Sequence, residues 1–158
     1  MTRTDQDLFA TAAVTTFKLN GQFLAVAEEL ARPAGITVAW WQVLGAILRE
    51  PLPVAGIARE MGLARQSVQR IADLLVAKGF AEYHPNPAHR RAKLVAVTEA
   101  GHNAVRRINP QHADMAKRLA AELGTERLAQ IADALTDLSA ALDRLEQSRS
   151  DVFLVFPK

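Results

Sequence analysis

The stretch "VAGIAREMGLARQSVQRIADLLVAKGF", residues 54–80, decides the fold of this chain. Its apolar residues recur at steps of three and four, which is the period of an amphipathic helix. Gly62 interrupts this pattern and Gly79 ends it, and glycine is the residue that most often terminates a helix. The stretch therefore predicts a short helix over residues 53–62 and a second helix over residues 64–79, joined by a tight turn.

The second predicted helix carries polar side chains that suit a nucleic acid. Its apolar residues would pack on the first helix and leave a polar set outside: Arg65, Gln66, Ser67, Gln69 and Arg70. Arginine and glutamine can each make two hydrogen bonds to guanine and adenine edges in the major groove, and serine suits a phosphate contact. The set lies near the helix N-terminus, the part of a recognition helix that enters the groove.

The hydrophobic period changes from 3.6 to 2 after Gly79. The segments "FAEYH" (80–84) and "AKLVAV" (92–97) predict two strands around a proline-containing turn. Arg90, Arg91 and Lys93 lie in or beside this turn. In a hairpin that follows such a helix, these cations favour contact with a narrow minor groove, although a solvated loop is the alternative. We therefore expect a mainly α-helical protein with a two- or three-stranded β wing, that is, a winged helix-turn-helix.

The flanking segments read as helices. Residues 5–31 form one, and residues 36–50 form another with Thr37 as its N-cap. Thr98 can cap a further helix, which should break near Ile108 because a proline follows at position 110.

The last predicted helix begins at a Thr125 cap, after Gly124, and carries a narrow apolar seam. Its steps of 3, 4, 3, 4 and 3 join Leu128, Ile131, Leu135, Leu138, Leu142 and Leu145. Such a heptad seam favours pairing of helices from two chains, although an internal core helix is the alternative. The apolar tail at residues 151–158 could pack on the same dimer.

Composition bounds the class of protein. The chain has 158 residues, of which 49% are hydrophobic, and this is enough for one compact core. The net charge is only +2, but residues 64–93 hold six basic and two acidic side chains, a local +4. The chain has no cysteine, so disulfides and thiolate metal sites are excluded.

The sequence also argues against other classes. No apolar run approaches the roughly 20 residues of a membrane span, and no signal-peptide pattern opens the chain, so we expect a cytoplasmic protein. It has no glycine-rich phosphate loop, nucleophile elbow or metal-spaced motif, so we expect neither an enzyme nor a cofactor. The four histidines, at positions 84, 89, 102 and 112, lack the spacing of a zinc site.

Residues 36–101 resemble the MarR (multiple antibiotic resistance regulator) family of bacterial transcription regulators. The matching motifs are "ITVAWWQVL", the stretch quoted above, and "NPAHRRAKLVAVTEAG" in the wing. The resemblance implies a homodimer that binds double-stranded DNA, with dimerisation helices at residues 1–35 and 101–158 around a DNA-binding domain at 36–100. It implies a ligand-responsive repressor acting on a pseudo-palindromic operator.

The resemblance also implies which residues contact DNA. The polar set on the second predicted helix and the wing arginines, Arg90 and Arg91, fall on the family's DNA-binding positions. Three positions depart from the family pattern: His89 replaces an aspartate that pairs with wing arginines, Pro53 replaces a capping serine or threonine, and Gly56 replaces a glutamate. The last two changes weaken a helix by roughly 1 kcal/mol each.

Three alternatives remain open. The family's small aromatic or anionic ligands make Phe17, Phe23, Trp40 and Trp41 candidate ligand contacts, although packing in the core or in an interface is the more common role of such residues. A dimeric winged module that binds a protein partner, rather than DNA, is the rival function, and a metal-sensing regulator is a third.

Overall fold

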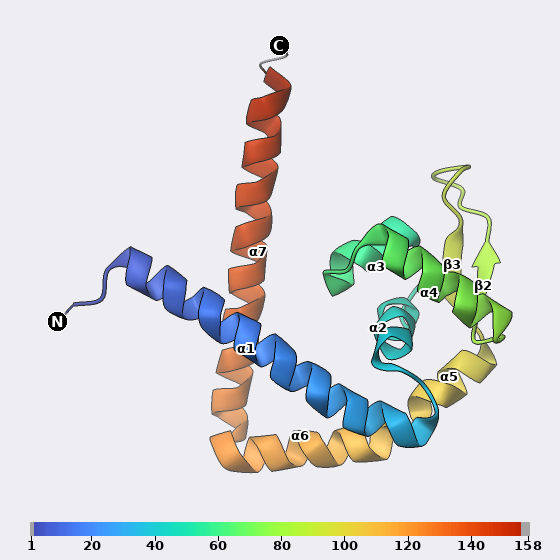
Figure 1. The fold of residues 1–158 in the computed structure, drawn as a ribbon, viewed down its shortest axis with the longest axis horizontal. Coiled ribbons are helices and arrows are strands. Elements are labelled where there is room, and N and C mark those ends of the chain that lie inside the picture. Colours follow the sequence, from blue (N-terminus) through green and yellow to red (C-terminus); the bar gives the residue numbers. More distant parts are fainter. Residues whose placement is uncertain (1, 156–158) are drawn as a thin grey trace. The chain divides into compact units, whose positions relative to one another are not determined.

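The computed structural model describes residues 2–155 of the chain (Figure 1). Its elements, in chain order, are α1 (Asp5–Ala31), the short 3-10 helix η1 (Arg32–Ala34), α2 (Val38–Ile47), β1 (Leu52–Pro53), α3 (Val54–Met61), α4 (Arg65–Ala77), β2 (Ala81–His84), β3 (Leu94–Val97), α5 (Glu99–Arg106), α6 (Asn109–Leu123) and α7 (Thr125–Val155). The chain forms two compact units, residues 1–112 and residues 113–158. The three-part division predicted from the sequence stays a prediction.

Helices α3 and α4 form the predicted helix-turn-helix. Gly62 follows α3 in the left-handed conformation, with φ of +64°, which favours glycine over residues that carry a Cβ. The Leu63 N–H then donates to Ala58 O at 2.9 Å, and the Val68 N–H donates to Ala64 O at 3.0 Å as α4 begins. The predicted turn between the two helices is therefore confirmed.

The wing is a three-stranded antiparallel sheet in the order β1-β3-β2. Strands β2 and β3 pair with Ala81 opposite Val97 and His84 opposite Leu94, as the period-2 pattern predicted. The two-residue strand β1 supplies the third strand, with Leu52 opposite Val95. Proline is tolerated there because β1 lies at the edge of the sheet and needs no further ladder donor.

A hydrophobic core fixes the orientation of α4. Six large side chains from α2, α3 and α4 are fully buried in it: Val43, Leu44, Ile47, Ile57, Val68 and Leu75. Burying a side chain of this kind stabilises the fold by about 1.5–3 kcal/mol. Because Val68 and Leu75 turn inward, the polar residues between them on α4 turn outward.

Gly101, in the first turn of α5, packs directly against the backbone of Phe80 at the start of the wing. The Thr98 side chain accepts from the Gly101 N–H at 3.2 Å, which confirms the predicted cap, and its hydroxyl donates to Gly79 O at 2.6 Å. A Cβ at Gly101 would lie 2.1 Å from Phe80 O, so only glycine fits. The chain breaks between α5 and α6 at the fully buried Ile108, as predicted.

Helices α3 and α4 are one or two residues shorter at each end than the predicted 53–62 and 64–79, and two other helix boundaries also differ from the prediction. Helix α2 ends at Ile47 instead of residue 50, because Pro51 disfavours helical backbone in the residue before it and the chain turns into β1. The Thr37 cap itself is confirmed by a 3.1 Å bond from the Trp40 N–H. The Thr125 cap was wrong: α7 begins at Thr125 itself, and the Leu128 N–H donates to Gly124 O at 3.0 Å.

The seam of α7 is apolar and accessible in the single chain. Leu128 and Ile131 are partly buried, whereas Leu135, Leu138, Leu142 and Leu145 are exposed. The side chains of the tail, residues 151–158, lie outside the described part. Within the part of the chain that the structure describes, no helix combines the length and apolar character needed to cross a membrane.

Candidate nucleic-acid interface

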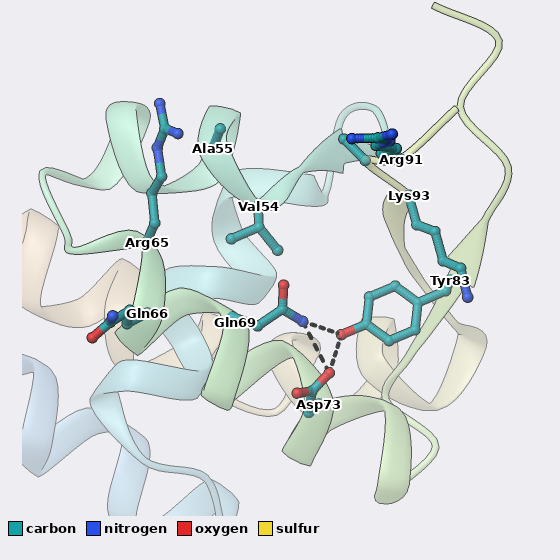
Figure 2. A pocket seen from close by; sticks show the side chains of 10 residues that line it. Val54, Ala55, Arg65, Gln66, Gln69, Asp73, Tyr83, Arg91 and Lys93 are labelled. Atoms are coloured by element: carbon teal, nitrogen blue, oxygen red, sulfur yellow. Dashed lines mark hydrogen bonds between the residues drawn. The ribbon is translucent and has the colours of Figure 1, made fainter. Parts of the chain in front are cut away.

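An open hollow of about 600 Å³ lies between α4, the start of α3 and the wing (Figure 2). Five of the residues predicted to contact DNA line it: Arg65, Gln66, Gln69, Arg91 and Lys93. They come from two segments separated by more than 20 positions, and the antiparallel wing brings the second segment back beside α4. The fold therefore gathers the predicted glutamines and most of the predicted cations on one surface.

The other three predicted DNA contacts lie outside this hollow. Ser67 and Arg70 are exposed on α4, and Arg90 is exposed in the wing turn. Exposed side chains on a helix and a hairpin that flank a positive hollow can reach the phosphates on either side of a groove. Ser67 and Arg70 therefore suit contacts with the phosphates better than contacts with the bases.

Two residues that the sequence pattern did not single out complete the hollow. Asp73 lies one helical turn after Gln69, and the Gln69 amide nitrogen donates to Asp73 Oδ1 at 3.0 Å. The same nitrogen lies 3.0 Å from the Tyr83 oxygen, and the Tyr83 hydroxyl donates to Asp73. The spacing of Gln69 and Asp73 was a readable signal, but only the tertiary fold brings in Tyr83 from β2.

The surroundings of Tyr83 keep its hydroxyl protonated. Burial, and then the hydrogen bond and negative charge of Asp73, raise the pKa of Tyr83 to about 12, while the Gln69 bond lowers it slightly. The Lys93 ammonium lies 5.8 Å from the centre of the Tyr83 ring, within the range of a cation–π contact. Tyr83 is therefore a hydrogen-bond donor throughout the physiological pH range.

The electrostatics of the hollow favour an anion. Arg65, Arg91 and Lys93 contribute three positive charges, against the single carboxylate of Asp73. That carboxylate is occupied by hydrogen bonds from Gln69 and Tyr83. Because the cations are exposed, their attraction for a phosphate backbone should weaken as salt rises.

The wing turn is ordered by backbone contacts at His89. The His89 N–H donates to Asn86 O at 3.2 Å, and the Ala92 N–H donates to His89 O at 3.2 Å. The Asn86 side chain accepts from the Ala88 N–H at 3.0 Å. Among the described residues, neither Arg90 nor Arg91 enters an ion pair. The turn is thus closed without the carboxylate that the family pattern has at position 89.

The four candidate ligand contacts divide between two settings. Phe23 and Trp41 line a second hollow of about 340 Å³ between α1, α2 and the end of α3. Trp40 instead packs edge-on against Phe80, with 6.2 Å between ring centres, and Phe17 is exposed on α1. Two of the four therefore share one surface hollow.

No metal centre is evident within the described residues, where no three histidine, aspartate or glutamate side chains come together in a way that could hold an ion. His112 instead packs edge-on against Trp41, with 5.8 Å between ring centres.

The helix-turn-helix and its three-stranded wing make this a winged helix-turn-helix protein. Residues 34–92 match the sequence profile of the MarR family. An uncharacterized protein of Mycobacterium tuberculosis is 34% identical over 136 residues, which cover 86% of this chain and 95% of that protein. The chain belongs to the MarR family of transcription regulators.

Solved structures share the fold. The transcriptional regulator MOSR of M. tuberculosis, solved in complex with DNA, superposes with a TM-score of 0.70 at 19% identity over 85% of this chain and 97% of its own. CouR of Rhodococcus jostii RHA1, solved with p-coumaroyl-CoA, gives 0.71 at 22% identity over 81% of this chain and 91% of its own. At these identities the likeness establishes the fold alone.

Proposed function

We propose that the protein is a sequence-specific DNA-binding regulator that acts as a homodimer on a pseudo-palindromic operator. The observation that carries the proposal is the hollow between α4 and the wing, which gathers three cations and two glutamines. Arginine and lysine supply affinity for phosphate, and glutamine supplies base recognition. The MOSR structure, solved with DNA, shares this fold.

In the proposed complex, α4 lies in the major groove and the wing follows the adjacent minor groove. Arg65, Gln66 and Gln69 face the base edges, since they line the hollow near the start of α4. Arg90 and Arg91 enter the minor groove, where negative potential is greatest when the groove is narrow. Ser67, Arg70 and Lys93 bind phosphates, and these contacts fix the position and orientation of the protein on the duplex.

The exposed apolar helices support a homodimer. The α7 seam leaves Leu138 at 36% exposure and Leu145 at 63%, and α1 leaves Phe9 at 66% and Phe17 at 76%. Surfaces of this kind are rarely left in water by a monomer. A two-fold dimer would place two copies of α4 about 34–36 Å apart, on half-sites one helical turn apart.

We further propose that a small aromatic or anionic molecule controls the dimer. The hollow beside Phe23 and Trp41 is lined by α1 and α2. A bound ligand would therefore contact the exposed helix α1 and also α2, which packs in the core beneath the proposed DNA-binding surface. CouR, which shares the fold, was solved with p-coumaroyl-CoA. A dimer seated on an operator covers DNA that polymerase needs, so repression is the expected outcome, and such a regulator acts in the cytoplasm.

The rival function is a winged module that binds a protein partner. The exposure and number of the cations favour DNA, because these charges would be poorly used in an apolar protein interface. Salt separates the two functions: several phosphate contacts make log K fall steeply with log salt, which an apolar interface would not do.

The first experiment is a selection of bound duplexes from a random pool by the full-length protein at two salt concentrations. We expect enrichment of an inverted repeat and strong weakening at the higher salt. Salt-sensitive binding without an enriched motif would contradict sequence-specific recognition. The absence of binding at either salt, in protein refolded to remove any bound ligand, would support the protein-partner function instead.

A further inference from the structure

We propose that Asp73 and Tyr83 orient the Gln69 amide so that α4 presents the Gln69 carbonyl oxygen, and not its NH2 group, to the bases. Gln69 would then recognise a base by its exocyclic amino group. This inference rests on the proposed function. It adds two positioning residues, Asp73 and Tyr83, which do not contact DNA themselves but decide which base Gln69 selects.

The chemistry of Asp73 settles which way the amide faces. The Gln69 nitrogen lies 3.0 Å from Asp73 Oδ1 and 3.0 Å from the Tyr83 oxygen. A carboxylate can only accept hydrogen bonds, so it requires the NH2 end of the amide. Turning the amide over would set Gln69 Oε1 against the Asp73 carboxylate. In Figure 2, Oε1 points away from Asp73 and Tyr83 on the side of the open hollow.

The two positioning residues come from different elements and hold each other. Asp73 lies on α4 and Tyr83 on β2, and the Tyr83 hydroxyl donates to Asp73. Tyr83 is half-buried, and the Lys93 ammonium lies 5.8 Å from the centre of its ring. The arrangement therefore ties the recognition helix to the wing and orders Gln69 before DNA arrives, which lowers the entropic cost of binding.

The orientation changes what Gln69 can read. A free glutamine contacts adenine with both ends: its oxygen accepts from N6, and its nitrogen donates to N7. With the NH2 group of Gln69 turned to Asp73 and Tyr83, the carbonyl alone remains for the base. Adenine N6 and cytosine N4 both offer a donor in the major groove, whereas guanine and thymine offer acceptors there. We therefore expect Gln69 to select adenine or cytosine without distinguishing them.

Gln66 is a matched internal control. It lines the same hollow on the same helix. Among the described residues, its side chain takes part in no hydrogen bond, whereas that of Gln69 makes two. Both ends of the Gln66 amide are available, so any adenine read by Gln66 should be recognised at N6 and N7 together.

The test is a selection of operators by the full-length wild type and by Gln69→Ala and Gln66→Ala. The operator position whose preference disappears in Gln69→Ala is the one that Gln69 reads. At that position we expect adenine and cytosine each to exceed guanine and thymine by about fivefold, and to differ from each other by less than about twofold. Purine, which lacks the N6 amino group, should weaken binding there, whereas 7-deazaadenine, which lacks N7, should bind like adenine.

A double variant, Asp73→Ala with Tyr83→Phe, frees the amide. Alanine favours a helix and phenylalanine keeps the aromatic ring, so the fold should persist, as circular dichroism would check. The preference should then narrow to adenine by about fivefold over cytosine, and 7-deazaadenine should become a poor substitute. A purely structural role for Asp73 and Tyr83 would lower affinity at every sequence without this change of base.

Three outcomes would overturn the proposal while wild-type DNA binding stands. The wild type could prefer adenine and lose affinity with 7-deazaadenine, the double variant could leave the preference unchanged, or Gln69→Ala could alter no base preference. If the wild type shows no salt-dependent DNA binding at all, the proposed function itself fails, so the two failures are distinguishable.

Discussion

The winged region, which runs from α2 to β3 (residues 38–97), and the long helix α7 use apolar residues in opposite ways. The winged region buries Leu44, Ile57 and Val68 completely and leaves charged and amide side chains outside. Helix α7 has no fully buried side chain among those described, and its leucines line one accessible seam. The winged region therefore carries its own core, whereas α7 has the surface of half an interface.

The largest effect is expected from breaking the α7 seam. The double variant Leu138→Asp, Leu142→Asp puts two charges where a dimer would bury leucine. We expect a monomer by sedimentation and a fall in operator affinity of about 100-fold or more, because two half-sites can no longer be engaged together. The core of the winged region should keep its near-ultraviolet circular dichroism.

Thr136→Asp is the control for the seam, since it adds one aspartate charge to α7 off the apolar stripe. It should remain a dimer. A dimeric Leu138→Asp, Leu142→Asp protein, or a monomer with full operator affinity, would contradict the assignment of the seam.

The next effect tests the core that the winged region carries by itself. Gly101→Ala places a Cβ 2.1 Å from the Phe80 carbonyl oxygen, which is backbone and cannot move aside. We expect a loss of about 1–3 kcal/mol in the free energy of unfolding, measured by denaturant titration.

Gly21→Ala provides the comparison on an exposed helix. No atom lies within 4 Å of a Cβ built at Gly21 in α1. Alanine in an open helix interior should stabilise by about 0.5–1 kcal/mol. If Gly21→Ala and Gly101→Ala changed the free energy of unfolding equally, the close contact between Gly101 and the Phe80 backbone would be contradicted.

A smaller effect is expected from Arg91, one cation of the proposed DNA-binding surface. Arg91→Ala should weaken binding to all sequences by about three- to tenfold and reduce the slope of log K against log salt by about 1. Fluorescence anisotropy at several salt concentrations measures both. Lys18→Ala, which removes a charge from α1, should leave the slope unchanged; an unchanged slope in Arg91→Ala would remove Arg91 from the DNA surface.

The smallest effect concerns Tyr83, whose pKa is raised to about 12 by burial and by Asp73. Since its pKa in the unfolded chain is near 10, the contribution of Tyr83 to stability is fully present below about pH 10 and is lost as pH rises toward 12. Tyr83 is the only tyrosine, so the phenolate absorbance reports it alone. Asp73→Ala should lower the midpoint of that titration, and a midpoint near 10 in the wild type would contradict the contact.

The sequence predicted the parts of the fold that depend on local chemistry. Gly62 and Gly79 stop their helices because glycine alone adopts positive φ freely, and Thr37 and Thr98 cap theirs. The change of period after Gly79 predicted β2 and β3. Each of these signals lies within a few residues of its effect, so no knowledge of the tertiary fold was needed.

Other features could not be predicted in this way. A two-residue strand such as β1 has no period to read, and it is a strand only because Leu52 pairs with Val95, some forty positions away. The Thr125 prediction failed because Gly124 already supplies the carbonyl that begins α7.

For the proposed DNA-binding surface, the sequence by itself determined which side chains would be available: arginines and glutamines on a helix, then cations in a hairpin. Only the tertiary structure decided which of them share a hollow, because strand pairing and not spacing brings Arg91 and Lys93 beside Gln69. It also decided the direction of the Gln69 amide. That direction depends on the Asp73 carboxylate, one helical turn after Gln69, and on the Tyr83 hydroxyl, 14 positions after Gln69. The two groups lie together only when β2 packs against α4.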